Sequence, residues 1–300
     1  MDEPMNVLIS GASGLVGSAL KTHLESLGHR VYTLKRGRTT GSFYWNPDIE
    51  QIHLDEKIHL DAVVCLNGVN IGDQRWSPQR KKAIIESRVR SVSLLARDLA
   101  KRFDPPDVLI CASAIGFYGD TGSELKSEQD GPGKNFLSEI VTQWEGAARP
   151  AMRRNIRTVF IRSGVVLSKE SGALKKMLLP FKLGLGGRIG DGQQYMSWID
   201  IEDEVRAIAF AITQNDLEGP VNLTAPHPVT NQEFTQTLGK TLNRPTPFPM
   251  PEWAVKLLFG EMGELLLLGS NRIDCAVLKE RGFEFSYPDL ESSLQHLIGT

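Results

Sequence analysis

Short apolar runs alternate with longer segments of helical periodicity through the first two-thirds of the chain. Five runs are apolar on both faces, which is typical of strands buried inside a parallel sheet. They are residues 6–10, 30–34, 61–66, 108–113 and 157–162. Segments 15–27, 77–101 and 136–154 carry apolar residues at helical spacing. This alternation predicts an α/β fold, a doubly wound parallel sheet with helices on both faces and right-handed crossovers.

The pattern loosens after about residue 165. A glycine-rich stretch at 184–192 predicts a surface loop, and 198–201, 202–213 and 221–224 predict a strand, a helix and a strand. Prolines then punctuate short helical segments. We expect residues 1–165 to form the sheet domain, to which residues 195–225 return. Residues 166–194 and 226–300 are expected to form a small α-rich cap over the carboxyl edge of the sheet.

Composition excludes several classes of protein. The 300 residues carry a formal net charge of −2, which argues against binding to nucleic acid or to an anionic membrane surface. No apolar run is long enough to span a membrane, and the acidic N-terminus does not look like a signal peptide, so we expect a cytoplasmic protein. The three cysteines, Cys65, Cys111 and Cys275, form no metal-binding motif, and no metal is expected.

A glycine turn follows the first predicted strand. Gly11, Gly14 and Gly17 stand between that strand and the first predicted helix, with Ser13, Leu15 and Val16 among them. In such a turn the first glycine permits a tight bend, the second admits a pyrophosphate and the third lets the helix pack closely. Free N–H groups and the helix dipole then face the anion. The segment therefore predicts a dinucleotide-binding turn.

The GxxGxxG spacing, together with further motifs, resembles the extended branch of the short-chain dehydrogenase/reductase superfamily. A closer resemblance is to its atypical epimerase-like subfamily, often labelled nucleoside-diphosphate-sugar epimerase or cell-division inhibitor. The matching segments are 66–68, 75–76, 86–88, 113–119, 144–145, 162–167, 179–187, 197–203 and 231–234. The resemblance covers residues 5–297 and implies a Rossmann-type sheet with a C-terminal cap. It also implies cofactor contacts at Leu66, Asn67, Gly68, Arg88 and Val165.

The end of the second predicted strand indicates which dinucleotide is bound. NAD-selective sheets place an acid there, but no acid occurs between Glu25 and Asp48. Lys35 and Arg36 stand at that position instead. A carboxylate would repel a 2′-phosphate, whereas a guanidinium binds it in a bidentate fork. Arg36, helped by Lys35, therefore predicts NADP(H).

The superfamily's usual Tyr-x-x-x-Lys pair is missing. Four residues after the five tyrosines stand Arg36, Asp48, Gly122, Ile199 and Glu291. In the helix expected to carry the pair, Phe136 or Leu137 replaces the tyrosine, and Ile140 or Val141 replaces the lysine. None of these side chains can move a proton.

Two functions remain open. In the first, hydride passes between NADP(H) and a small carbonyl, alcohol or nucleotide-sugar-like substrate, with Tyr118 as the proton donor and Ser113 orienting the carbonyl oxygen. Packing beneath the cap is an equal alternative for Tyr118. In the second, the protein is a non-catalytic NADPH-binding regulator or redox sensor that acts through protein contacts.

Two further expectations concern the substrate side and the assembly. Trp198, at the end of a short strand, lines a substrate pocket or packs in the core. Of the clustered acids Asp200, Glu202, Asp203 and Glu204, the last three fit the N-terminal turn of the next helix, which is favoured over a metal site. The resemblance makes a homodimer possible, although atypical members can be monomeric.

Overall fold

The computed structural model describes residues 3–37 and 41–299. Its main element is an eight-stranded sheet in the order β11-β7-β6-β5-β1-β2-β3-β4. The strands are β1 (Asn6–Ser10), β2 (Arg30–Arg36), β3 (Phe43–Asn46), β4 (Gln51–Leu54), β5 (Ala62–Cys65), β6 (Val108–Ala114), β7 (Arg157–Ser163) and β11 (Gly219–Leu223). All neighbours are parallel except β3 and β4. The predicted doubly wound sheet is confirmed.

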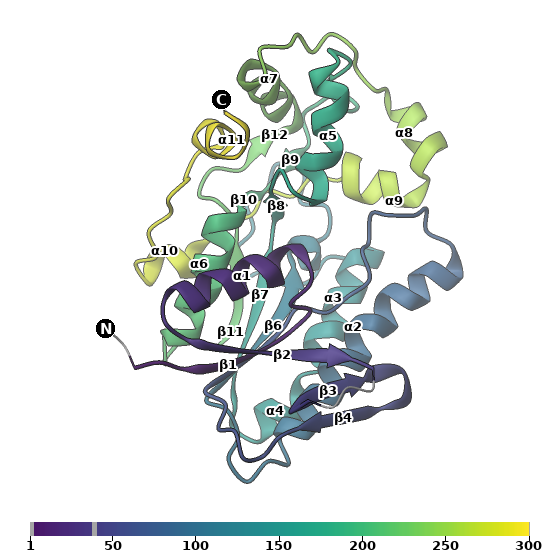
Figure 1. The fold of residues 1–300 in the computed structure, drawn as a ribbon. Helices are drawn as coiled ribbons and strands as arrows, with labels where there is room; N and C mark the ends of the chain where they lie inside the picture. Colours follow the sequence, from purple (N-terminus) through teal and green to yellow (C-terminus); the bar gives the residue numbers. More distant parts are fainter. Residues whose placement is uncertain (1–2, 38–40, 300) are drawn as a thin grey trace.

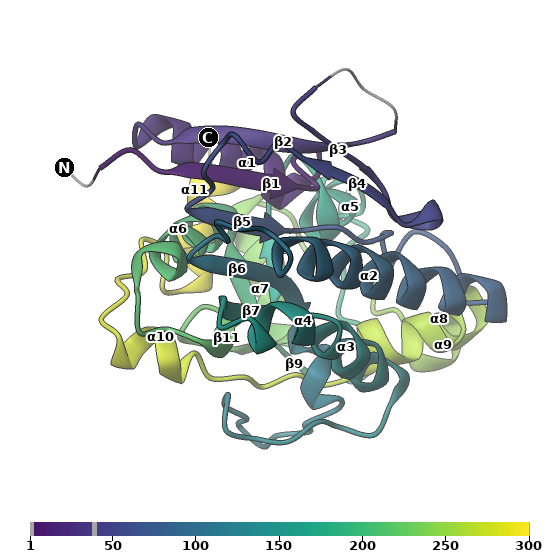
Figure 2. The same cartoon turned by 90° about the horizontal axis from the view of Figure 1, so that it is seen from below.

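Helices cover both faces of the sheet (Figures 1 and 2). One face packs against α1 (Leu15–Ser26) and α6 (Ile201–Thr213) through a core that includes Leu20, Leu24 and Ile208. The other face packs against α2 (Pro78–Leu99), α3 (Phe136–Gly146) and α4 (Arg149–Arg153). These apolar stripes provide the main driving force for assembling the layers.

The sequence pattern missed the hairpin of β3 and β4. Each strand has only four residues, too few for a clear alternation. Trp45 in β3 is nevertheless 2% exposed and belongs to the core on the α2 face. The predicted helix 136–154 is two helices, because α3 ends at Gly146 and Pro150 stands in the first turn of α4.

Short helices gather above the sheet, at the top of Figure 1. They are α5 (Gly172–Lys182), α7 (Asn231–Thr241), α8 (Glu252–Phe259), α9 (Glu261–Gly263), the π-helical segment Glu264–Leu268 and α11 (Leu290–Ile298). Two small sheets lie with them, formed by β8 (Val165–Leu167) with β10 (Trp198–Asp200) and by β9 (Tyr195–Met196) with β12 (Val229–Thr230). Residues 185–188 between these elements form neither helix nor strand.

The expected return of residues 195–225 to the large sheet holds only for their last part. β11 pairs with β7, but β10 pairs with β8 in a separate two-stranded sheet. Part of the predicted cap, residues 226–300, packs against the large sheet instead. Cys275, Leu278 and Phe283 belong to the core between the sheet and helices α1 and α6. The short helix α10 (Ala276–Glu280) packs there beside β11. The division into two domains stays a prediction.

No helix within residues 3–37 and 41–299 is long and apolar enough to cross a membrane.

Candidate functional site

The glycine turn lies at the point where the strand order reverses. β1 has β2 on one side and β5 on the other, and in doubly wound folds ligands bind outside the carboxyl ends of the strands at such a point. Gly11 follows β1 with φ 78°, a conformation that L side chains rarely adopt. A Cβ on Gly11 would lie 2.9 Å from the carbonyl oxygen of Leu66, which follows β5.

Gly17 holds helix α1 against this turn. A Cβ on Gly17 would lie 2.2 Å from the carbonyl oxygen of Gly11, so only glycine permits this approach. Gly14 is the N-cap of α1 and makes no side-chain cap, while Ser13 and Gly14 are exposed. Open N–H groups at the start of a helix favour anions. The turn can therefore receive a phosphate.

Arg88, on α2, approaches the same region from the other side. A Cβ on Gly68 would lie 3.0 Å from the guanidinium carbon of Arg88, and this group stacks 5.0 Å from the ring centre of Trp144. Burial, and then the charge of Arg80, lower the pKa of Arg88 to about 10, so it stays protonated at neutral pH. No carboxylate within residues 3–37 and 41–299 forms an ion pair with Arg88. A half-buried cation without a carboxylate partner is stabilised by an anionic ligand.

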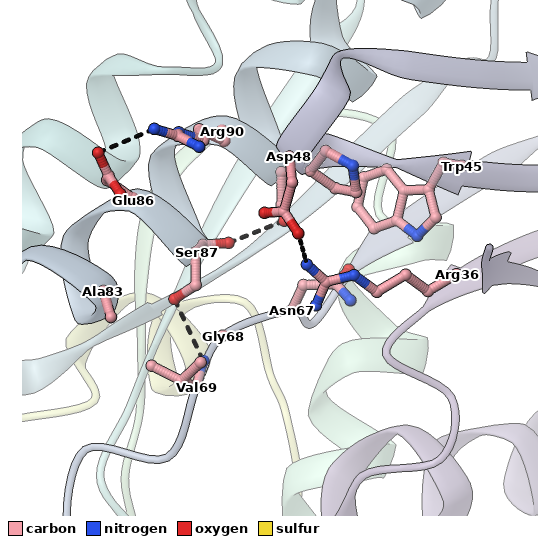
Figure 3. Close-up of a pocket in the computed structure, with 12 residues that line it drawn as sticks. Arg36, Trp45, Asp48, Asn67, Gly68, Val69, Ala83, Glu86, Ser87 and Arg90 are labelled. Atoms are coloured by element: carbon pink, nitrogen blue, oxygen red, sulfur yellow. Dashed lines mark hydrogen bonds and ion pairs between the residues drawn. The ribbon is translucent and has the colours of Figure 1, made fainter. Parts of the chain in front are cut away.

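A cavity of about 320 Å³ opens beside residues 67–69, which follow Leu66. Figure 3 shows Arg36 at the end of β2, Asn67 and Gly68 after β5, and Ser87 and Arg90 on α2 around it. Arg90 pairs with Glu86 at 2.9 Å, and Ser87 accepts a hydrogen bond from the backbone N–H of Val69 at 3.2 Å. The structure therefore brings Arg36, Asn67 and Gly68 together, as the sequence predicts.

Lys35 does not line this cavity. Successive side chains of a strand point to opposite faces, and Lys35 lies with Thr33 and Phe43 along another hollow. Because of this alternation, Lys35 is not placed to help Arg36 bind a phosphate in the cavity.

Two residues of the cavity were missed by the sequence reasoning. Arg90 follows Ser87 by one helical turn, so the spacing of polar residues on the 77–101 helix contained a signal for it. Asp48 pairs with Arg36, although it lies twelve residues further along the chain. The turn residues Asn46 and Pro47 before it indicated a reversal of the chain.

Ser113 is held in a buried polar network at the carboxyl ends of β6 and β7. Its hydroxyl donates to Glu145 Oε1 at 2.6 Å, and Arg162 donates to both oxygens of Glu145, from Nε at 2.8 Å and from Nη2 at 2.9 Å. The Arg162 and Glu145 side chains are 4% and 13% exposed. The Arg162 guanidinium also stacks 3.5 Å from the ring centre of Phe117. This network fixes the orientation of Ser113.

Tyr118 belongs to the same network and is 4% exposed. Its hydroxyl donates to Asn222 Oδ1 at 2.7 Å and accepts from Arg162 Nη1 at 3.0 Å. Ile273 packs against it, and the backbone of Ser270 and Arg272 hydrogen-bonds to Thr121 and Lys126. Burial raises the pKa of Tyr118. The burial and the hydrogen bonds of Tyr118 favour the packing alternative.

Trp198 is fully buried, with 0% of its surface exposed. It packs with Leu167, Phe234 and Leu294, and its indole N–H donates to the carbonyl of His227 at 3.2 Å. The structure corrects the expectation that Trp198 lines a pocket, because a buried aromatic ring in an apolar cluster is a core residue. Val165, the first residue of β8, pairs with Trp198 and packs against the same cluster.

The helix expected to carry the Tyr-x-x-x-Lys pair presents an apolar surface. Leu137 and Ile140 of α3 are 8% and 2% exposed and form a cluster with Ile84 of α2. The partly buried residues around it are Val69, Ile71, Trp76, Ile85, Phe136 and Leu265. These side chains form an apolar cluster between α2 and α3, and none of them can transfer a proton.

Glu204 is a buried carboxyl behind the carboxyl end of β7. It is 1% exposed and accepts a hydrogen bond from the Ser163 hydroxyl at 2.6 Å. Its second oxygen has no partner within the described part of the chain. Burial raises the pKa of Glu204 from 4.5 to about 7. Glu202, Asp203 and Glu204 lie in the first turn of α6 as predicted, and Asp200 caps the helix by accepting from the N–H of Glu202.

Known proteins resemble the chain over almost its whole length. A sequence model of the NAD dependent epimerase/dehydratase family matches residues 7–223, and a model of a domain of unknown function, DUF1731, matches residues 250–297. An epimerase family protein of Mycobacterium bovis is 44% identical over 291 residues, which are 96% of each chain.

Solved structures also resemble the chain over almost its whole length. The crystal structure of the human epimerase family protein SDR39U1 with NADPH has a TM-score of 0.87 and 33% identity, and covers 98% of this chain and 99% of that chain. UDP-glucose 4-epimerase of Thermotoga maritima, solved with UDP-glucose, has a TM-score of 0.75 at 16% identity, covering 98% and 97% of the two chains, and shares the fold. The resemblance to extended short-chain dehydrogenases is thereby confirmed, and the chain belongs to the NAD dependent epimerase/dehydratase family.

Proposed function

We propose that this protein binds NADP(H) at the glycine turn and transfers a hydride between the cofactor and a small carbonyl, alcohol or nucleotide-sugar-like substrate. One observation carries the proposal: a cavity lined by Arg36 and Arg90 also includes Asn67, which directly follows Leu66, and the Leu66 carbonyl faces Gly11 of the turn. The human relative solved with NADPH supports the choice of cofactor.

The residues present fit such a dinucleotide. The turn from Gly11 to Gly17 would hold the pyrophosphate, Arg36 the 2′-phosphate, and Asn67 and Gly68 the adjoining ribose. Arg88 offers a desolvated positive charge to the anionic ligand. When bound, NADP(H) supplies the hydride chemistry, while the protein supplies orientation and exclusion of water.

In the proposed active site, Ser113 is a polar side chain whose orientation is fixed by its hydrogen bond to Glu145. Reduction of a carbonyl adds a hydride to carbon and a proton to oxygen. The Ser113 hydroxyl donates its one proton to Glu145, so it would orient the substrate oxygen by accepting a hydrogen bond from its alcohol form. The proton donor is not assigned, since Tyr118 is buried and α3 presents Leu137 and Ile140.

The apolar surface of α3 favours a second candidate function. A protein that binds NADPH without turning it over needs no proton donor, and the cluster around Leu137 provides none. This protein would then be a regulator or sensor that reports on NADPH through protein contacts.

Deuterium transfer separates these functions. We expect purified protein, incubated with NADPH deuterated at C4 and a metabolite extract, to pass deuterium to a small molecule that mass spectrometry identifies. Both C4 faces are tested, because the structure does not specify the face. NADPH binding is measured in the same sample. Binding without any labelled product would contradict net hydride transfer to an extract component, and would leave the regulator and an epimerase that returns its hydride to the same molecule.

Charge reversal at Arg36 tests the cofactor assignment. Arg36→Glu is expected to weaken NADPH binding by about 10- to 100-fold, because charged hydrogen bonds to the 2′-phosphate are lost. NADH lacks that phosphate, so its affinity should change little. Fluorescence titration measures both. Lys35→Glu is the matched control, with the same charge change on the neighbouring residue outside the cavity. Equal losses for NADPH and NADH would refute the assignment.

A further inference from the structure

The hairpin of β3 and β4 places a carboxylate in the same cavity as Arg36. Asp48 lies in a 3-10 turn, Pro47–Ile49, between the two strands. The side chain of Asn46 accepts a hydrogen bond from the Asp48 N–H at 3.1 Å, and Pro47 is buried. Trp45 anchors the preceding strand in the core. The backbone therefore fixes Asp48 at the cavity, where its side chain meets Arg36 (Figure 3).

The pair of Arg36 and Asp48 is accessible to exchange. The two side chains are 65% and 61% exposed, and exposed ion pairs are weak. A carboxylate and a phosphate offer a guanidinium the same kind of paired oxygen acceptors. Asp48 thus binds the Arg36 guanidinium, which the proposed function assigns to the 2′-phosphate.

The second arginine of the cavity is neutralised in the same way, because Arg90 pairs with Glu86. Each of the two cations therefore already has an internal acid. A phosphate entering the cavity must compete with these carboxylates, whereas a ribose with a free 2′-hydroxyl carries no such charge. The selectivity between NADP(H) and NAD(H) then depends on the free energy needed to break the ion pairs Arg36–Asp48 and Arg90–Glu86.

We propose that Asp48 is an internal counter-ion that holds Arg36 in the free protein, and that the 2′-phosphate of NADP(H) displaces it from the guanidinium. This inference rests on the proposed function. It makes Asp48 a specificity-determining residue that lowers the preference for NADP(H) over NAD(H). Asp48 lies outside the second strand, yet its carboxylate acts at the end of that strand, on Arg36.

The variant Asp48→Asn tests this role, since the amide keeps the shape of the side chain and removes its charge. We expect the NADPH dissociation constant, measured by fluorescence titration, to fall about threefold to tenfold. The constant for NADH is expected to change less than about twofold. Adenosine 2′,5′-bisphosphate and 5′-AMP, titrated by calorimetry, provide a readout independent of the nicotinamide and should show the same contrast.

Two controls sharpen the result. Glu50→Gln makes the same charge change on the same hairpin, two residues away, where Glu50 pairs with Arg97 instead, and should leave both affinities unchanged. In an Arg36→Gln background, Asp48→Asn should no longer tighten NADPH binding, because the arginine that it releases is gone.

Each contrary outcome has a distinct meaning. Unchanged NADPH affinity in Asp48→Asn, equal tightening for NADH, or tightening that persists without Arg36 would overturn the counter-ion role while leaving NADP(H) binding intact. A wild-type protein that binds neither NADPH nor the bisphosphate would instead overturn the proposed function, and the counter-ion role with it. Thermal unfolding of each variant confirms that it is folded.

Discussion

Replacing Arg162 by methionine is expected to lower the free energy of unfolding by about 3–5 kcal/mol, because it leaves a largely buried carboxylate without its cation. Glu145 loses donors from Nε and Nη2, and Tyr118 loses the donor from Nη1. Methionine fills a similar volume and keeps contact with the Phe117 ring. Urea denaturation measures the loss.

The double variant Arg162→Met with Glu145→Leu distinguishes a stranded charge from lost packing. Removing both partners eliminates the buried charge, so stability should recover to within about 2 kcal/mol of the wild type. Arg281→Met is the matched control at the surface, where the pair with Asp216 is exposed, and should cost less than about 1 kcal/mol. A double variant as unstable as Arg162→Met would show that packing dominates.

Replacing Glu204 by glutamine is expected to stabilise the protein at pH 8 much more than at pH 5. Burial raises the pKa of Glu204 from 4.5 to about 7 in the folded state. Between these values the folded protein binds more protons than the unfolded chain, so its stability falls as the pH rises. The loss is complete above pH 7 and amounts to about 3 kcal/mol for this group.

Glutamine accepts the Ser163 hydroxyl equally well and does not ionise, so the variant lacks this pH-dependent loss. The difference in melting temperature between the variant and the wild type should grow from near zero at pH 5 to about 5 °C at pH 8. Glu218→Gln, an exposed acid that follows α6, is the control and should show no such trend. A constant difference across this pH range would contradict the burial of an ionising carboxyl.

The sheet was predictable because its central strands are buried on both faces. β1 matches its predicted residues, and the runs at 108–113 and 157–162 fall within one residue of β6 and β7. The hairpin of β3 and β4 was missed because four-residue strands carry little periodicity. Helix α5 was missed because Pro180 stands inside its pattern.

The candidate site was predictable where backbone geometry dictates the residue type. Gly11 and Gly17 could not be replaced without a clash, and such positions leave a readable pattern. Tyr118 and Trp198 were ambiguous because an aromatic residue after a strand suits either a pocket or a core. Their burial depends on segment 270–275 and on α11, which lie far along the chain. Asp48 and Arg36 meet only through a hairpin.

The C-terminal region packs into the interior of the rest of the molecule. Its match to a separate family model begins at residue 250, yet Ile273 packs on Tyr118, and Cys275, Leu278 and Phe283 complete the core beneath the sheet. Asn271 also donates to the carbonyl of Gly119 at 2.5 Å. Recombination between relatives at that boundary would transplant part of the sheet's own interior together with the helices above it. A substitution on either side of that boundary therefore changes the packing of the other side.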